Sequence, residues 1–153
     1  MDGPVTTIRF IAALLVCALL SACALSGDPY ANYKKSWGMY VASDTVNTFC
    51  LSPSLRFLVA DIEFHFGRKV VVSSGYRDPM HNSRVGGADN SYHMKCEAMD
   101  IFIPGVSKSR LIAYAMRNSK VGGLGCYPGR TFIHVDVRKR PAGWRKPVTF
   151  SGC

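Results

Sequence analysis

The clearest periodic pattern in the chain follows Ser52-Pro53 and has the spacing of a helix. Apolar residues recur there three and four positions apart, on what would be one helix face: Leu55, Leu58, Val59, Ile62 and Phe66. A serine before a proline is a favourable start for a helix, and Gly67 is a favourable stop. We therefore expect a helix that begins at Pro53 and ends before Gly67.

Three short segments have the pattern of β-strands, at residues 69–73, 97–103 and 131–137. Residues 74–92 contain glycines, an Asp-Pro pair and two asparagines, so we expect a long loop, and such loops are usually functional. Ser107 can cap a second helix that runs to about Ser119. Two helices and at least three strands predict an α+β fold, with a mainly antiparallel central sheet and flanking helices.

The N-terminus has the features of a targeting segment. Residues 10–20 form an uncharged apolar run after Arg9, shorter than a membrane span but typical of a signal peptide. The run closes with Leu20-Ser-Ala-Cys23, which resembles the bacterial lipobox, where the cysteine becomes the first residue of the mature protein and carries lipid. The alternative is an ordinary cleaved signal in which Cys23 is incidental.

This interpretation divides the chain into three parts. We expect a lipoprotein-type signal peptide over residues 1–22, a lipidated N-terminus and linker over residues 23–44, and one folded domain over residues 45–153. In a Gram-negative host, Ala24 lacks the aspartate that typically retains lipoproteins in the inner membrane. We therefore expect a periplasmic lipoprotein whose lipid is in the outer membrane rather than in the inner one.

The number and positions of the cysteines are consistent with an exported domain. Two of the six fall in or at the end of the signal segment, and four remain for the domain: Cys50, Cys96, Cys126 and Cys153. Four thiols in an exported domain predict two disulfides, with three possible connectivities. None of them has Cys-x-x-Cys spacing, which argues against a cysteine-rich zinc site.

Charge is distributed unevenly along the chain. The net charge is +9; residues 1–100 carry nine charges of each sign, whereas residues 101–153 carry ten basic residues and a single acid, Asp136. A basic segment is usually a solvated face, and it can also favour anionic glycopeptide or membrane surfaces. Nucleic acid is not an expected partner, because an exported chain with no recognised binding motif gives no reason for one.

Two predicted strands each carry a polar residue suited to bind metal. Alternation in the segment 131–137 separates His134 and Asp136 from the apolar residues. Asp100 lies in the preceding strand, and His93 lies seven residues before it. Two histidines and one aspartate form a three-ligand set that leaves a position open for water. The alternatives are ordinary loop or core histidines and salt-bridged acids, in a disulfide-stabilised domain without metal.

Several motifs carry a resemblance to a known family. They are Ser73-Ser-Gly-Tyr-Arg77, Asn82, Gly86-Gly-Ala88, Ser91-Tyr-His-Met-Lys-Cys-Glu-Ala-Met-Asp100, Gly122-Gly-x-Gly-x-Tyr127, and Phe132-Ile-His-Val-Asp136 with Trp144. In these the chain resembles the zinc D-Ala-D-Ala carboxypeptidase and murein endopeptidase family, in a wider group with lysostaphin and the sonic hedgehog signalling domain. The resemblance covers about residues 45–146 and implies the hedgehog and D-Ala-D-Ala-peptidase type of zinc fold.

The resemblance implies a site and an activity. His93, Asp100 and His134 would hold one Zn²⁺, Arg77 would bind a carboxylate or carbonyl oxygen of the substrate, and Ser91 would orient the His93 segment. The implied activity is hydrolysis of peptide bonds in peptidoglycan stem peptides or cross-links, by a carboxypeptidase or an endopeptidase. The alternative is a non-catalytic zinc-bearing module of the same fold that binds cell wall or protein. Separately from the resemblance, we expect the chain to be a monomer.

Two further aromatic residues, Tyr127 and Trp144, either pack in the domain or line the substrate cleft of the implied enzyme. The family usually has glycine where this chain has Cys96, which indicates a local disulfide. Many members also have an acid or histidine two or three residues before the last zinc histidine, where this chain has Thr131 and Phe132.

Asp136 is the natural substitute for the missing base. It could instead orient His134, or simply pair with Arg138 or Arg140.

The implied metal also suggests a disulfide pairing. Cys96 begins the strand of Asp100, and Cys126 precedes the strand of His134. If both strands bring ligands to one metal, their upstream ends lie close, which favours Cys96–Cys126 and leaves Cys50–Cys153.

Overall fold

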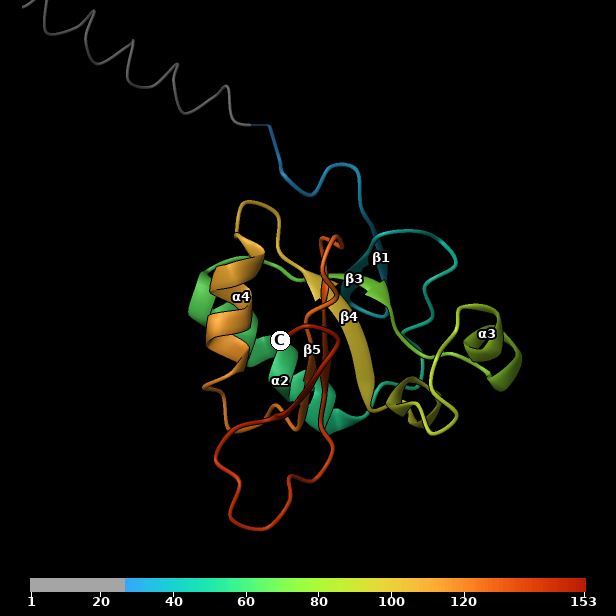
Figure 1. Cartoon of the computed structure of the whole chain (residues 1–153). Helices are drawn as coiled ribbons and strands as arrows, with labels where there is room; N and C mark the ends of the chain where they lie inside the picture. The colour runs from blue at the N-terminus through green and yellow to red at the C-terminus, as the bar shows by residue number, and fades with distance from the viewer. Residues whose placement is uncertain (1–26) are drawn as a thin grey trace, which may run out of the picture. The chain divides into compact units, whose positions relative to one another are not determined.

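The computed structural model describes residues 27–153 and divides into two units, Met1–Asn32 and Tyr33–Cys153 (Figure 1). The predicted signal peptide and Cys23 lie outside the described residues. In the first unit, the N–H of Ala31 donates to the carbonyl of Asp28 in a turn. The second unit holds the strands and helices, in the order β1 (Lys34–Ser36), β2 (Met39–Val41), α2 (Pro53–Phe66), β3 (Val71–Ser74), α3 (Pro79–Arg84), η1 (Tyr92–Lys95), β4 (Ala98–Phe102), α4 (Lys108–Ala115), β5 (Gly123–Gly125), β6 (Ile133–Asp136) and β7 (Val148–Phe150).

Helix α2 confirms the helical prediction at both ends. The Ser52 hydroxyl accepts a hydrogen bond from the N–H of Leu55, and Pro53 occupies the first turn, where its missing N–H costs nothing. Gly67 ends the helix in the left-handed conformation with a φ of 61°. Most of the predicted apolar face is buried in the core, and Phe66, its last residue, is partly buried against that core.

The seven-stranded sheet has the order β1-β2-β3-β4-β6-β5-β7 and is mixed. Strand β2 pairs with β3 in parallel, and β5 pairs with β7 in parallel, whereas the other pairs are antiparallel. The prediction of a mainly antiparallel sheet is therefore wrong in this respect. The physical reason is the connection: α2 crosses over between β2 and β3, and a crossover of this length returns the chain in the same direction.

The domain also begins earlier than residue 45. Strands β1 and β2 lie within residues 23–44, which we expected to be a linker, and they form one edge of the sheet. Residues 74–92 are not entirely loop, because Asp78 caps the short helix α3 by accepting from the N–H of His81. Helix α4 ends at Ala115 rather than near Ser119.

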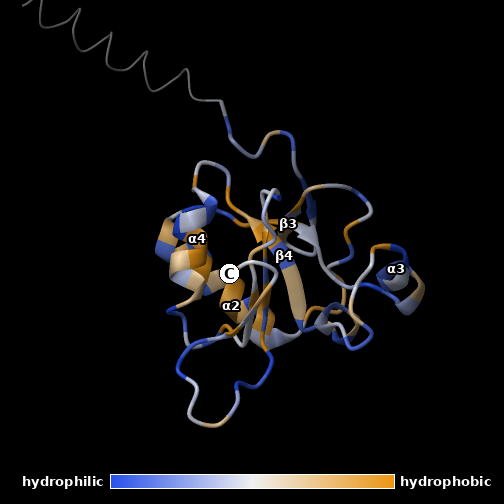
Figure 2. Ribbon diagram, in the orientation of Figure 1, coloured by the Kyte–Doolittle hydropathy of each residue, from blue (hydrophilic) through white to orange (hydrophobic). Residues whose placement is uncertain are grey.

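The core lies between the sheet and two helices. Helices α2 and α4 lie side by side and are joined by a hydrogen bond from the Tyr114 hydroxyl to the Asp61 carbonyl, 3.3 Å long, and Asn118, just after α4, donates to the Asp61 carboxylate at 2.9 Å. Figure 2 shows apolar residues where these helices meet the strands. Ile133 and Val135 of β6 are buried in this core, so the predicted alternation is confirmed and His134 and Asp136 belong to the other face. Within residues 27–153, none of the helices has the length and apolar character that crossing a membrane requires.

The disulfides are Cys50–Cys96 and Cys126–Cys153, with Cα atoms 5.6 Å and 5.0 Å apart. The predicted pairs Cys96–Cys126 and Cys50–Cys153 are wrong. Strands β4 and β6 are antiparallel, so the residues that precede them lie at opposite ends of the pair rather than together. Cys126 instead follows β5, whose parallel partner β7 leads to the C-terminal Cys153.

Candidate metal centre

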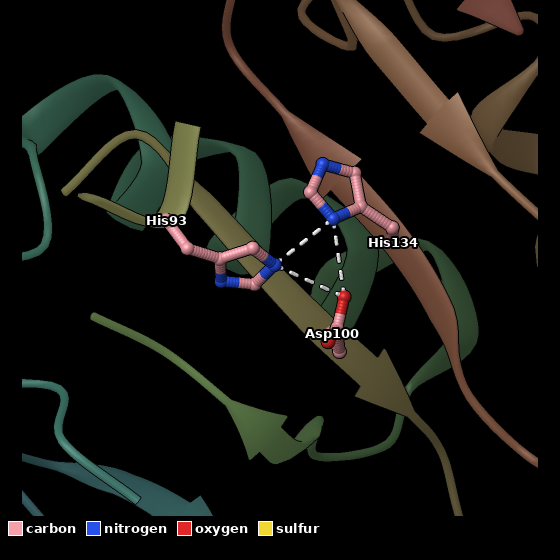
Figure 3. Close-up of side chains that lie close together, drawn as sticks. All are labelled: His93, Asp100 and His134. Atoms are coloured by element: carbon pink, nitrogen blue, oxygen red, sulfur yellow. Dashed lines mark hydrogen bonds and ion pairs between the residues drawn. The ribbon is translucent and has the colours of Figure 1, made fainter. Parts of the chain in front are cut away.

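Three buried side chains meet on the polar face of the sheet. His93 comes from η1, Asp100 from β4 and His134 from β6, and Asp100 and His134 are direct partners in the antiparallel ladder. His93 Nε2 lies 3.0 Å from His134 Nδ1 and 3.3 Å from Asp100 Oδ1, and His134 Nδ1 lies 3.1 Å from the same oxygen (Figure 3). The structure thus brings together the three residues that the sequence predicted as ligands.

The spacing of these three atoms suits zinc. Zinc bonds to nitrogen and oxygen are about 2.0–2.1 Å long, so two ligands of a tetrahedral site lie about 3.3 Å apart. The three measured distances are close to that value. Two imidazoles and one carboxylate are also a donor set that leaves the fourth tetrahedral position for water or substrate. The residues present therefore fit a zinc ion.

Each of the three side chains is held at its remote atom. His93 Nδ1 donates to the carbonyl of Gly75 at 2.6 Å, which turns the other nitrogen toward the triad. Asp100 Oδ2 accepts from Arg77 Nη2 at 2.5 Å, and His134 Nε2 lies 3.1 Å from Asp136 Oδ2. Partners of this kind fix the tautomer and orientation of metal ligands.

The electrostatics of the triad favour a cation. Burial alone raises the pKa of Asp100, but its hydrogen bonds with His134 and His93 outweigh burial and hold that pKa well below its usual range. Burial lowers the pKa of His134, whereas hydrogen bonds with Asp100 and Asp136 raise it above its ordinary value. Ionised carboxylates that stabilise a positive imidazole would stabilise a metal ion at the same place.

Asp136 lies behind His134, away from the three ligand atoms. It is fully buried and accepts hydrogen bonds from Arg138 at both carboxylate oxygens. Burial raises its pKa, but hydrogen bonds with His134 and Arg138 reverse the effect and lower that pKa to about 2. These contacts are the ones expected of the alternative, in which Asp136 orients His134 and pairs with Arg138, and the role as a base stays a prediction.

The glycines of β5 make room for this ion pair. A Cβ atom at Gly123 would lie 2.3 Å from Asp136 Oδ2 and 2.6 Å from Arg138 Nε. Gly123, in the Gly-Gly-x-Gly motif, thus lets β5 pair closely with β6 beside Asp136, which supports the candidate ligand His134.

Arg77 and Ser91 lie next to the triad. Arg77 Nε also donates to Ser74 Oγ at 2.8 Å, and only 14% of its side chain is exposed. It therefore holds Asp100 directly, in addition to facing the cavities as the substrate prediction requires. Ser91 caps η1 by accepting from the N–H of His93, in agreement with its predicted orienting role.

Two cavities adjoin the triad. The first, of about 540 Å³, is lined on its aromatic side by Tyr92, Tyr127 and Phe150, together with His93, His134 and Arg138. The second, of about 370 Å³, is lined by residues that include Asp100, Ser74, His81, Arg130 and Phe132. Arg77, Gly87 and Tyr127 line both. The two cavities thus adjoin each other at these shared residues, and each includes at least one residue of the triad.

The predicted aromatic pair separates in the structure. Tyr127 lines the cleft, whereas Trp144 is 55% exposed and lines another cavity, with Met116 and Lys146. The prediction that Trp144 lines the cleft is therefore wrong, because the connection between β6 and β7 carries it away. Sequence reasoning missed Phe150 and Gly75: β7 is too short to show periodicity, and a backbone carbonyl leaves no signal in a sequence.

The segment that matches known proteins contains all three residues of the triad. Residues 33–136 match a family model described as Peptidase M15. The peptidoglycan L,D-endopeptidase MepK of Escherichia coli is 36% identical over 75 residues, which cover 46% of this chain and 41% of that protein. The probable peptidoglycan L,D-endopeptidase MepK of Haemophilus influenzae is 36% identical over 97 residues, 57% of this chain and 50% of that protein. The matched part of the chain spans half the length of these curated relatives or less.

Proposed function

This chain belongs to the peptidase M15 family, and from that premise we propose that it is a zinc-dependent peptidase that hydrolyses peptide bonds of peptidoglycan. The observation that carries the proposal is the triad itself. Three ligand atoms lie 3.0–3.3 Å apart, and every remote atom of the three side chains has its own hydrogen-bond partner. Partners at the remote atoms are expected of a metal site, because they fix the tautomer and the orientation of the ligands.

The bond that we propose as the target is an L,D peptide bond within stem peptides or cross-links. Both relatives described above are named as L,D-endopeptidases of peptidoglycan. The two cavities support an endopeptidase, because cleavage inside a chain requires room for substrate on both sides of the metal. A carboxypeptidase, the other activity implied by the resemblance, would need room for only a short end on one side.

The residues around the triad have separable tasks in this proposal. When bound, zinc supplies a Lewis acid that polarises a carbonyl group and makes a water molecule more acidic. Arg77 and Asp136 hold the ligands Asp100 and His134, and the guanidinium edge of Arg77 faces the path of the substrate. Arg138 and Arg130 give the two cavities positive charge, which suits the carboxylates of stem peptides.

One observation favours a second candidate, a zinc-bearing module that binds cell wall or protein without cleaving it. Of the described residues that line the two cavities, Asp100 alone is a carboxylate, and it belongs to the triad. Thr131 and Phe132 hold the positions where related enzymes often have a base, and Asp136 faces the wrong nitrogen of His134.

Digestion of purified muropeptides, followed by mass spectrometry, separates the two candidates. The peptidase proposal expects new peptide termini at an L,D bond, and expects a chelator to abolish them. A binding module would retain muropeptides on an affinity column and release no fragment.

The location that we propose is the bacterial envelope, with the chain a monomer that is lipidated at Cys23 and attached to the outer membrane. Support comes from the lipobox-like sequence and from two disulfides, which persist in oxidising compartments. A peptidoglycan substrate would also lie in that compartment.

A further inference from the structure

The Cys50–Cys96 disulfide lies beside the one metal ligand that does not come from the sheet. Cys96 directly follows η1, and its N–H donates to the carbonyl of His93. The cross-link therefore lies three positions after one candidate ligand, His93, and four positions before another, Asp100. The carbonyl of Cys96 in turn accepts from the N–H of Ser52, just before α2.

Cys96 has an unusual backbone conformation for a residue with a side chain. Its φ is 59° and its ψ is 20°, in the left-handed region that glycine adopts readily and other residues disfavour. This conformation ends η1 and turns the chain into β4. Other contacts must hold Cys96 in this conformation. Two are present at this residue: the disulfide with Cys50 and the hydrogen bond from the N–H of Ser52.

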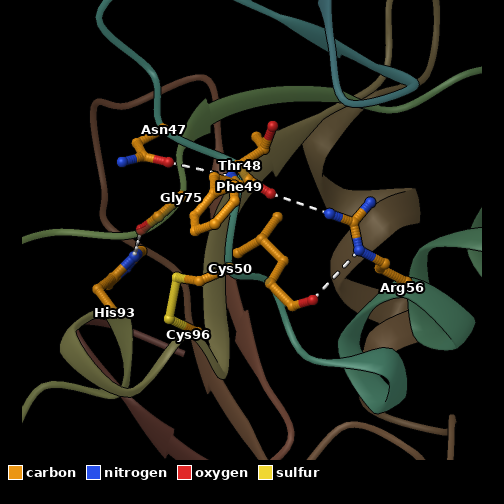
Figure 4. Close-up of a disulfide and its surroundings, with 9 residues drawn as sticks. Asn47, Thr48, Phe49, Cys50, Arg56, Gly75, His93 and Cys96 are labelled. Carbon is orange, nitrogen blue, oxygen red and sulfur yellow. Dashed lines mark hydrogen bonds between the residues drawn. A yellow bond between two sulfur atoms is a disulfide. The ribbon is translucent and has the colours of Figure 1, made fainter.

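The segment that carries Cys50 also supports the ring of His93 (Figure 4). The carbonyl of Asn47 accepts from the N–H of Tyr76 at 2.7 Å, and these two residues form an isolated β-bridge. A Cβ at Gly75 would lie 2.2 Å from the Asn47 oxygen, so the two backbones are in close contact. Gly75 in turn accepts the hydrogen bond from His93 Nδ1.

The same short stretch, residues 47–52, is therefore attached to His93 from two directions. It reaches the imidazole through Gly75 and the backbone of η1 through Cys96. Arg56 of α2 fixes this stretch from its other side, because its guanidinium donates to the carbonyls of Thr48 and Leu51. The cross-link thus joins an anchored segment to an element of only four residues.

We propose that the Cys50–Cys96 disulfide is a positioning group for His93, which sets metal affinity by holding Cys96 in the left-handed conformation that closes η1. This inference rests on the proposed role of the triad as a metal site. The other disulfide, Cys126–Cys153, joins the residue after β5 to the last residue of the chain and not to the His93 segment, so the two cross-links can be compared.

The test compares the zinc affinity of three double variants with that of the unchanged protein, by competition with a chromophoric chelator at one pH. Cys50→Ala/Cys96→Ala removes the cross-link and leaves a Cβ at the left-handed position. Cys50→Ala/Cys96→Gly removes the cross-link and relieves that position. Cys126→Ala/Cys153→Ala removes the other disulfide, and each variant replaces both cysteines of a pair, so that neither partner is left as a free thiol that could bind zinc.

We expect the Ala variant to bind zinc about 10–100-fold more weakly, as when other partners of metal ligands are lost. The Gly variant should recover most of the affinity, and the Cys126→Ala/Cys153→Ala variant should stay within about twofold of the unchanged protein. Imidazole nitrogen NMR of the metal-free proteins adds a readout independent of activity. His93 should keep a single Nδ1–H tautomer in the Gly variant and show mixed tautomers in the Ala variant.

Three outcomes would overturn the inference: a folded Ala variant with unchanged zinc affinity, equal losses in the Ala and Gly variants, or an equal loss without Cys126–Cys153. Circular dichroism establishes that each variant is folded, and the Gly variant provides the comparison if the Ala variant fails to fold. The proposed function fails separately, if the unchanged protein binds no zinc.

Discussion

Asp100 and His134 are direct partners across the antiparallel strands β4 and β6, with His134 Nδ1 3.1 Å from Asp100 Oδ1. Two of the three candidate ligands are therefore fixed by the ladder of the sheet, over a buried core. His93 is different, because it comes from a four-residue 3₁₀ helix outside the sheet. The triad thus combines a rigid pair with a ligand whose position depends on local contacts.

His93→Ala should remove most of the bound zinc and leave the fold intact. The two remaining ligands are held by the sheet, but two protein ligands are too few for a stable zinc site. Zinc content by atomic emission, on purified protein, measures the change. His81→Ala is the matched control, because His81 lines the second cavity without contacting the triad. Full zinc occupancy in His93→Ala would contradict the assignment of this ligand.

Asp136→Asn should weaken zinc binding by about 10–100-fold, because the amide holds His134 less firmly and no longer pairs with Arg138. The measurement is zinc affinity by chelator competition, with turnover measured separately at saturating zinc. Asp61→Asn, on the far side of the core beside Lys120, is the control that should leave affinity unchanged.

The base role predicted from the sequence has a different signature. It expects normal zinc affinity in Asp136→Asn, together with a loss of turnover of about 10²–10⁴-fold. That result would contradict the orienting role that the contact with His134 Nε2 supports.

Gly123→Ala should destabilise the protein and loosen the metal site together. The added methyl group would overlap Asp136 Oδ2 and Arg138 Nε, both buried or half-buried, so the pair must move. Overpacking of this kind costs about 1–3 kcal/mol. Thermal unfolding gives the change in stability, and Gly27→Ala, where a Cβ meets nothing within 4 Å, is the control. An unchanged melting temperature and zinc affinity would show that the pair adjusts freely.

The sequence predicted the parts of this structure that depend on local patterns. Helix α2 has a cap, an apolar face and a stop, and the alternation in β6 separated His134 from the core correctly. The three ligands could be found because their spacing matches a known family. Each of these signals lies within a short stretch of chain.

What the sequence did not predict depends on pairing between distant segments. Strands β1, β2 and β7 have three residues each, too few for a period, and their parallel or edge positions follow from crossovers. The disulfides were mispaired because the direction of β4 relative to β6 was not known. The role of Asp136 depended on which nitrogen of His134 it would face, and alternation alone cannot distinguish the two.

Cys23→Ser should release the protein from the membrane fraction, if Cys23 carries the lipid. The lipid would be the attachment that the lipobox-like sequence at Leu20–Cys23 predicts. Fractionation of cells, with immunoblotting of the soluble and membrane parts, gives the result, and Cys17→Ser within the same segment is the control. Unchanged membrane association of Cys23→Ser would favour the ordinary cleaved signal or another attachment.

The most direct test of the central proposal is a zinc titration of the metal-free protein, with cleavage of muropeptides followed at every step. We expect no cleavage before zinc is added, then a rise in rate that reaches its plateau at about one zinc ion per chain. The same titration of His93→Ala should give no rise. Full cleavage by the metal-free protein, or zinc bound at the triad without any cleavage, would contradict the account of this chain as a zinc peptidase.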